Sequence, residues 1–350
     1  APAGPILSLG TIFPNRHGVS APERRPVRFC LWAPSSQTAT ARQAPAVRLL
    51  YDGADLQPHS RGMTLSAYDF AATSRLLETG NGNIHYHEAG TGPALLLLHG
   101  SGPGVTAWAN YENNLPVFAS EFRCVVPDFP GYGKSQPREG MPIEVCIDAV
   151  VELMDALGID RAHIIGNSLG GLVGSHIAAR LPQRVGRFVS IGGIGLNVFS
   201  AFPAEGLNLL TEFIEDPTRE RVEQWLRSMV YDQSMVTDEL IEQRYSRAME
   251  PVTFASTKQL YAREAINGLA RFREGPGAIA TIEHLAQIQA PTLITWGRDD
   301  RVTPMDIGLL PMRIIPDAEL HVFPRCGHWA MIEKKHAFET LVMSFLTRDA

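Results

Sequence analysis

One serine, flanked by glycines, is well placed in this sequence to act as a nucleophile. Ser168 lies within Gly166-Asn167-Ser168-Leu169-Gly170, a G-x-S-x-G pattern. An apolar segment typical of a buried strand, 162–165, precedes it, and a segment with helical spacing, 169–181, follows it. A strand-to-helix turn of this kind exposes the serine Oγ at the top of a sheet, where it can attack a carbonyl carbon. The alternative is a plain glycine–serine turn, and the flanking strand and helix favour the nucleophile.

His328 is the residue expected to activate that serine. A serine hydroxyl is a weak nucleophile until a nearby base takes its proton. His328 comes shortly after a predicted strand, 319–323, so it lies at the carboxyl end of a strand, as Ser168 does. Because these ends meet at one edge of a parallel sheet, we predict that His328 is the general base and later the general acid. Four other histidines fall within predicted strands and are expected to be structural: His85, His87, His163 and His321.

An aspartate should hold the imidazole in the correct tautomer and orientation. Two candidates, Asp299 and Asp300, follow the predicted strand 292–296. Asp300 fits a G-x-x-D…P arrangement with Gly297 and Pro304, so we predict that it is the acid. Asp299 stays open as the alternative, although it could instead pair with a neighbouring arginine.

A loop of small residues follows the predicted strand 94–98. It reads His99-Gly100-Ser101-Gly102-Pro103-Gly104. Glycine-rich loops at this place turn backbone N–H groups towards the nucleophile, where they stabilise a developing oxyanion. We predict that the donors are the amides of Ser101 and Leu169. A simple tight turn is the alternative, but it would not require so many small residues in a row.

The elements that must position these residues alternate between strand and helix. Apolar segments typical of strands are followed by segments with helical spacing, and short turns join them. This alternation predicts parallel βαβ units and a doubly wound sheet of the α/β class. The expected strands are 83–88, 94–98, 123–126, 162–165, 188–191, 292–296 and 319–323, and the expected helices are 143–157, 169–181, 306–314 and 337–346.

A long helical segment interrupts the alternation, since no buried strand is expected between 193 and 290. About a hundred residues exceed what one crossover needs, so we predict a helical cap over one end of the sheet. Its expected helices are 219–231, 238–249 and 257–269. The chain then divides into a Pro/Arg-rich extension, 1–70, a first part of the core, 71–192, the cap, 193–290, and a second part of the core, 291–350. Prolines interrupt every candidate helix of the extension, which we expect to be poorly ordered, a small docking arm being the alternative.

Composition and charge narrow the class of protein. Hydrophobic residues make up 45% of the 350 residues, which suits a globular core. The formal net charge is −6, so the chain lacks the excess of basic residues that is typical of nucleic-acid-binding proteins. The longest apolar runs fall far short of the roughly 20 residues that span a bilayer. Four scattered cysteines, Cys30, Cys124, Cys146 and Cys326, lack the spacing of a metal site or a disulfide scaffold. We therefore expect a cytoplasmic protein without a signal peptide and without a nucleic-acid or membrane partner.

Six motifs together resemble the meta-cleavage-product hydrolases, the carbon–carbon bond hydrolases of aromatic degradation within the α/β-hydrolase superfamily. The motifs are His99–Gly104, Trp108–Asn110, Gly166–Gly171, Met229–Ser234, Gly297–Arg301 and Arg325–Trp329. The resemblance runs from about residue 75 to residue 348. It implies an α/β-hydrolase fold, in which helices flank a mostly parallel central sheet and a helical cap is inserted between core strands.

The resemblance also implies a ligand and the residues that bind it. The family's substrates are 2-hydroxy-6-oxo-hexa-2,4-dienoates, and Arg244 looks like the arginine with which family members bind the substrate carboxylate. By the same resemblance, Asn110 and Asn167 hydrogen-bond the carboxylate and the 2-oxo end, Trp329 walls the pocket, and Met229 lines it. No metal and no organic cofactor is implied, because the substrate itself supplies the electron sink. Relatives are commonly homodimers or larger homo-oligomers.

The implied reaction begins with ketonisation of the dienol and ends with 2-hydroxypenta-2,4-dienoate and a carboxylic acid. The sequence leaves open whether an acyl-enzyme or a gem-diol forms, and whether the C6 substituent is aryl, alkyl or hydrogen. A serine carboxylesterase or thioesterase with the same triad is the alternative function, and a non-catalytic binding protein is a third. Epoxide hydrolases and haloalkane dehalogenases are disfavoured, because their nucleophile is an aspartate where this chain has Ser168.

Overall fold

The computed structural model describes residues 49–50 and 68–348. They belong to one compact unit, Ala46–Ala350, and a second unit, Ala1–Pro45, lies outside the described residues. The predicted extension 1–70 therefore falls outside them as well, apart from residues 49–50 and 68–70. Within the described ranges, no helix is both long enough and apolar enough to cross a bilayer.

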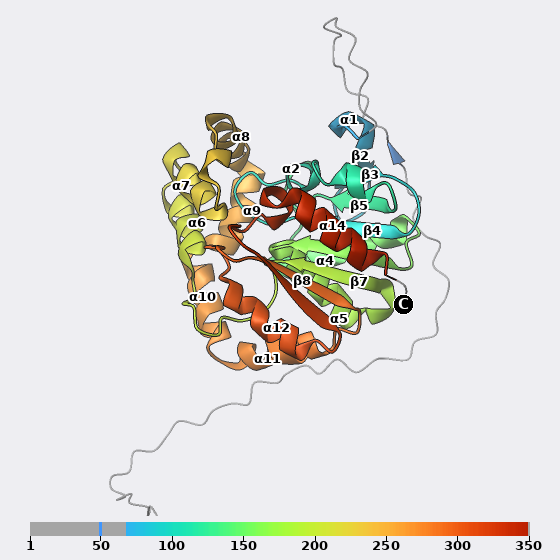
Figure 1. The fold of residues 1–350 in the computed structure, drawn as a ribbon. Coiled ribbons are helices and arrows are strands. Elements are labelled where there is room, and N and C mark those ends of the chain that lie inside the picture. The colour runs from blue at the N-terminus through green and yellow to red at the C-terminus, as the bar shows by residue number, and fades with distance from the viewer. Residues whose placement is uncertain (1–48, 51–67, 349–350) are drawn as a thin grey trace, which may run out of the picture. The chain divides into compact units, whose positions relative to one another are not determined.

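A nine-stranded sheet forms the centre of the unit, in the order β1-β2-β3-β5-β4-β6-β7-β8-β9 (Figure 1). The first three pairings are antiparallel, and all pairings from β5 to β9 are parallel. The predicted α/β fold class and the predicted strands are thus confirmed, and the antiparallel β1 and β2 are additions. The strands are β1 Leu49–Leu50, β2 Ser74–Leu77, β3 Ile84–Ala89, β4 Ala94–Leu98, β5 Arg123–Pro127, β6 Ala162–Asn167, β7 Val185–Ile191, β8 Thr292–Gly297 and β9 Ala318–Phe323.

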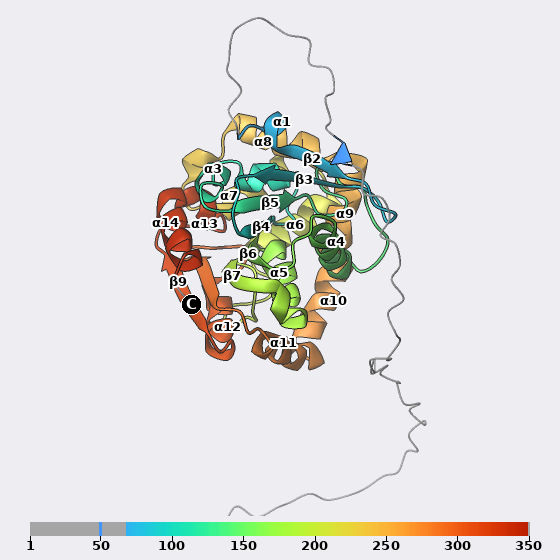
Figure 2. The same cartoon turned by 90° about the vertical axis from the view of Figure 1, so that its right-hand side faces the viewer.

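Helices cover both faces of this sheet, which explains why its central strand β4 is apolar throughout, whereas the edge strand β9 alternates between exposed and less exposed residues. Figure 2 shows α3 and α14 on one side of the sheet and α4 and α5 on the other. Successive residues of a strand point to opposite faces, so Leu95 and Leu97 join one buried cluster, and Leu96 and Leu98 join the other. The core helices are α1 Phe70–Thr73, α2 Ala107–Tyr111, α3 Leu115–Phe118, α4 Pro142–Ala156, α5 Leu169–Arg180, α12 Leu309–Ile314, α13 Ala330–Glu333 and α14 Lys335–Leu346.

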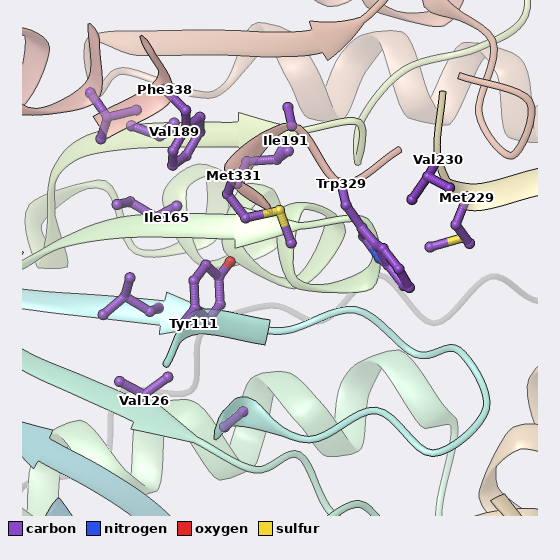
Figure 3. Packing of buried hydrophobic residues seen from close by; sticks show 14 of the residues in the cluster. Tyr111, Val126, Ile165, Val189, Ile191, Met229, Val230, Trp329, Met331 and Phe338 are labelled. Atoms are coloured by element: carbon purple, nitrogen blue, oxygen red, sulfur yellow. The ribbon is translucent and has the colours of Figure 1, made fainter. Parts of the chain in front are cut away.

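The first of these clusters extends from the sheet into the helical insertion. Figure 3 shows Phe338 of α14 over Val189 of β7, and at the other end Trp329 next to Met229. Met229 is the last residue of an inserted helix, so core and cap share one continuous apolar interior.

Six α-helices lie between β7 and β8, where the sequence predicts the cap. The predicted helix 257–269 is wrong, because two helices meet at Ala262, whose backbone is extended with ψ of 147°. No proline or glycine marks this break in the sequence, and the helical spacing continues across it. The helices are α6 Glu205–Glu215, α7 Arg219–Met229, α8 Asp238–Ala248, α9 Pro251–Tyr261, α10 Arg263–Arg273 and α11 Pro276–Ala286, of which α6 and α11 were not expected.

Five buried or half-buried histidines of this fold favour their neutral form. Burial lowers the pKa of His99 to about 4. Burial is also the largest cause of the low pKa of four other histidines, which is about 3 in one of them and about 4 in the other three. These four are His87, His163, His176 and His284. Protonation of any of them in the folded state is unfavourable.

The free energy of unfolding should therefore fall as the pH falls from about 6.5 to 4. The folded-state pKa lies below the ordinary 6.5, so the unfolded chain binds protons first, and stability is complete above that range. For the fully buried His99 alone, the difference corresponds to roughly 3 kcal/mol once the pH reaches 4. Urea denaturation at pH 7.5 and pH 5 measures the loss. In a His163→Leu variant, the free energy of unfolding should depend less on pH. His336 is exposed, so a His336→Gln variant should match the parent. A denaturation midpoint that does not change with pH in the parent would refute the prediction.

Candidate active site

Ser168 occupies a crowded turn between β6 and α5. Its backbone has φ of 51° and ψ of −113°, a conformation that is costly for a residue with a side chain. A Cβ on Gly166 would lie 2.2 Å from the carbonyl oxygen of Gly170, and one on Gly170 would lie 2.1 Å from that of Leu98. Only glycine fits at these two places, which is the physical reason for the G-x-S-x-G spacing. The Ser168 N–H donates to the Ile191 carbonyl of β7 at 2.8 Å, so the neighbouring strand also holds the turn.

His328 and Asp300 form a buried pair on the loops after β9 and β8. His328 Nδ1 lies 2.7 Å from Asp300 Oδ2, and both side chains are almost fully buried. The other carboxylate oxygen accepts the backbone N–H groups of Val302 and Thr303 at 2.8 and 2.9 Å, and Thr303 Oγ1 donates to Asp300 Oδ2 at 2.9 Å. With Nδ1–H directed at the carboxylate, the imidazole leaves Nε2 free to accept a proton.

Asp299 has a different environment from its neighbour. Its carboxylate pairs with Arg298 at 3.2 Å, with about a third of its side chain exposed, and it accepts the Cys326 N–H at 3.3 Å. The structure therefore places Asp300, and not Asp299, against the imidazole of His328. The sequence favours the same aspartate, and its catalytic role stays a prediction.

A single cavity brings together most of the predicted site residues. Ser168 and His328 line it at the sheet edge, and the cap closes it from above. The other predicted residues on its wall are Ser101, Asn110, Asn167, Met229, Arg244 and Trp329. Asp300 lies behind His328, and Leu169 does not line this cavity but a different pocket, so its backbone amide stays a predicted contribution.

The glycine-rich loop after β4 lies against the nucleophile turn. A Cβ on Gly100 would be 3.1 Å from Asn167 Oδ1 and 3.6 Å from Ser168 Cβ, so the loop backbone approaches the serine closely. His99 fixes the start of the loop, because its Nε2 accepts the Phe129 N–H at 2.9 Å and its Nδ1 donates to the Gly100 carbonyl. This geometry is consistent with an oxyanion hole, and the amides of Ser101 and Leu169 remain its predicted donors.

Arg244 of α8 is a buried cation that faces the cavity. Its side chain is 3% exposed, and its Nε and Nη1 have no hydrogen-bond partner. Burial, followed by the nearby charge of Arg247, lowers the pKa of Arg244 to about 10, so the guanidinium is still charged at neutral pH. Its only cation–π contact among the described residues is with Trp329, at 5.3 Å from the ring centre. The carboxylate of Glu112 is near enough to favour the charged form of Arg244, but no ion pair between them is formed among the described residues. An anionic ligand would therefore reduce the cost of burying this charge.

Two further donors without partners line the same cavity. Asn110 Oδ1 accepts the Gly100 N–H at 3.5 Å, which leaves its Nδ2 unpaired, and Trp225 Nε1 is unpaired as well. Asn167 differs, because its Nδ2 already donates to the Ile191 carbonyl at 3.3 Å. The unpaired N–H groups of Arg244, Asn110 and Trp225 together suit a ligand that offers several oxygen acceptors, such as a carboxylate.

Sequence reasoning missed three residues of this site. Trp225 and Tyr261 line the cavity from α7 and α9, and Thr303 contacts His328 Nδ1 at 3.2 Å. The Tyr261 hydroxyl is hydrogen-bonded to Ser101 Oγ across the cavity. The two cap residues belong to no recognisable motif, whereas Thr303 could have been suspected from its place beside Pro304.

Ser168, His328 and Arg244 line the same cavity, which is the arrangement expected of a serine nucleophile with its base beside a site for an anionic group. Among the residues with described positions, no group of three His, Cys, Asp or Glu side chains is placed to hold a metal ion.

Comparison with known proteins identifies close relatives of this chain. The sequence model of the alpha/beta hydrolase fold family matches residues 93–335. The 2-hydroxy-6-oxo-6-phenylhexa-2,4-dienoate hydrolase of Burkholderia cepacia is 40% identical over 274 residues, which cover 76% of this chain and 92% of that protein. A 2-hydroxy-6-oxononadienedioate/2-hydroxy-6-oxononatrienedioate hydrolase of Burkholderia vietnamiensis is 40% identical over 273 residues, covering 76% and 91%. The solved meta-cleavage product hydrolase of Pseudomonas fluorescens IP01, complexed with acetates, has a TM-score of 0.69 and 33% identity, covering 76% of this chain and 94% of its own.

Covalent labelling of Ser168 by a fluorophosphonate tests the geometry without any assumption about the substrate. An Asp300→Asn change should slow labelling by about 10⁴-fold, the loss in turnover that this change causes in a serine protease triad, because the imidazole takes the wrong tautomer. Asp299→Asn should label at nearly the parent rate, and Ser168→Ala should not label. Mass spectrometry of the modified peptide gives the rates. The assignment is wrong if Asp299→Asn shows the large loss and Asp300→Asn does not.

Proposed function

Since this chain belongs to the meta-cleavage product hydrolases of the alpha/beta hydrolase fold, we propose that it hydrolyses a carbon–carbon bond in a 2-hydroxy-6-oxo-hexa-2,4-dienoate. Such compounds are ring-fission products of aromatic degradation. Relatives at similar identity are named for a 6-phenyl dienoate and for a nonadienedioate, so they leave the C6 substituent of this chain's substrate open.

One observation carries the proposal: the unpaired guanidinium of Arg244 shares a cavity with Ser168 and His328. A simple ester needs only the nucleophile and the oxyanion donors. A dienoate also has a carboxylate, which Arg244 and the free Nδ2 of Asn110 would bind by charge-assisted hydrogen bonds. The reacting carbonyl at C6 would then lie towards Ser168.

The reaction proceeds in two stages on these residues. First the proton of the C2 hydroxyl leaves and another is added at C5, which gives a 2-oxo-3-enoate with a saturated C5. His328 then takes the proton of Ser168, and either the serine oxygen or a water molecule that it activates attacks C6. The amides of Ser101 and Leu169 stabilise the oxyanion that forms.

Cleavage of the C5–C6 bond places its electron pair on C5, conjugated through C3–C4 to the C2 carbonyl. Reprotonation gives 2-hydroxypenta-2,4-dienoate, and water supplies the oxygen of the carboxylic acid that forms from C6. In one route Ser168 becomes an acyl-enzyme, and in the other it activates water to form a gem-diol. Both routes use the same base and the same oxyanion donors.

Two further expectations belong with this proposal. Cys124, Cys146 and Cys326 are buried free thiols, which supports a reducing, cytoplasmic location. A homodimer or larger homo-oligomer remains a prediction, drawn from the resemblance to relatives.

A colorimetric panel tests the class of reaction. Dienoates that carry phenyl, methyl or hydrogen at C6 are yellow, and their hydrolysis removes the colour. We expect loss of colour for at least one of them, and no loss with Ser168→Ala. Rapid turnover of p-nitrophenyl esters without any loss of dienoate colour would instead identify a carboxylesterase.

Replacement of Arg244 tests the carboxylate site. Arg244→Gln should raise KM for the dienoate by roughly 10- to 100-fold, since a charged hydrogen bond in a buried site is lost. Turnover of a neutral p-nitrophenyl ester should change little. Arg247→Gln is the matched control, because Arg247 lies on the same helix and does not line the catalytic cavity. Equal losses on dienoate and ester would remove the proposed role of Arg244.

A further inference from the structure

Ser101, whose amide is a predicted oxyanion donor, is bonded to the cap through its side chain. Its Oγ is hydrogen-bonded at 2.5 Å to the hydroxyl of Tyr261, the last residue of α9. Ser101 is only 3% exposed, so water has little access to this bond. Burial raises the pKa of Tyr261, and its hydroxyl therefore stays protonated at neutral pH. A polar contact inside the catalytic cavity, which both residues line, thus joins the cap to the glycine-rich loop.

The backbone of Ser101 depends on contacts from outside the loop, because a glycine stands on each side of it. Gly100 and Gly102 restrict φ and ψ very little, so the local sequence does not determine the direction of the Ser101 N–H. The cap limits the position of the loop directly after the serine. A Cβ on Gly102 would lie 2.3 Å from the ring of Trp225, so the loop backbone is pressed against α7 at this point.

A tyrosine of the core bonds a second atom of the same serine. Tyr132 lies on the loop between β5 and α4, and its hydroxyl donates to the Ser101 carbonyl at 3.4 Å. Ser101 is thus bonded by two tyrosines, at its carbonyl from the core and at its hydroxyl from the cap. Of these two bonds, only the one to Tyr261 depends on the position of the cap.

The other two tyrosines of the cap do not reach the site. Tyr231 is exposed, and the hydroxyl of Tyr245 on α8 donates to the Pro217 carbonyl at 3.5 Å, within the cap itself. Neither of them lines the catalytic cavity. Tyr261 lies at the end of α9, directly before the extended backbone of Ala262.

We propose that Tyr261 is a positioning residue of the reaction, whose hydroxyl holds Ser101 so that the Ser101 N–H points to the place where the oxyanion forms. The inference rests on one part of the proposed function, the role of the Ser101 amide. It extends that function, because stabilisation of the oxyanion then depends on a helix of the cap. A donor that is out of line stabilises the transition state less, whereas binding of the substrate carboxylate at Arg244 is unaffected. The expected signature is therefore a loss in kcat without a rise in KM.

A Tyr261→Phe variant removes the hydroxyl and keeps the ring, so the packing of the cap is preserved. We expect kcat for the dienoate to fall roughly 5- to 20-fold, with little change in KM. The maximal rate at which a fluorophosphonate labels Ser168 should fall by a similar factor, because the phosphoryl oxygen uses the same donors. Tyr245→Phe is the matched control, since it removes a cap hydroxyl outside the cavity, and it should match the parent in both measurements.

A double-mutant cycle separates positioning from packing. Ser101→Ala removes the other partner of the bond and keeps the amide, so it should cause about the same loss as Tyr261→Phe, and the double variant should lose no more than either. An unchanged kcat in Tyr261→Phe, a loss mainly in KM, or losses that multiply in the double variant would overturn the inference. Failure of the parent to cleave any dienoate would instead refute the proposed function, and the labelling rates would still decide the role of Tyr261.

Discussion

The close approach of three backbone segments around Ser168 is the constraint on which the rest of the site depends. The turn after β6 crosses the end of β4 so tightly that positions 166 and 170 have no room for a side chain. This contact fixes the serine at the carboxyl edge of the sheet, where the loops after β8 and β9 bring Asp300 and His328. The geometry of the nucleophile is thus a property of the backbone, and the parallel order of the strands supplies its partners.

Charged groups around the cavity that Ser168 lines differ in how fully they are hydrogen-bonded. Around the catalytic pair, every carboxylate oxygen of Asp300 is occupied by donors, so this acid is committed to positioning the imidazole. Arg244, by contrast, keeps its Nε and Nη1 without a hydrogen-bond partner. The fold is therefore satisfied where it must be rigid, and unsatisfied where a ligand can complete it.

Features that depend on local sequence could be predicted, and features that depend on packing between distant segments could not. The strands, the nucleophile turn and the histidine loop each have a signal within a few residues, so the fold and the catalytic pair were accessible from the sequence. The sequence favours Asp300 over Asp299 by its spacing from Gly297 and Pro304, and the hydrogen bond to His328 distinguishes the two in the structure. Trp225 and Tyr261 reach the cavity only because the cap folds over the sheet. The helix break at Ala262 comes from the same packing, and no glycine or proline at that place indicates it in the sequence.

The cap is also bonded directly to the catalytic loop, and this has a mechanical consequence. The backbone N–H of His328 donates to the carbonyl of Met229 at 2.7 Å, at the point where α7 ends. Glu333, just beyond the histidine, accepts the N–H groups of Tyr231 and Asp232 at 2.8 and 2.9 Å. The end of α7 and the loop that carries His328 therefore share one set of hydrogen bonds, so the backbone of residues 229–232 helps to fix the position of the imidazole.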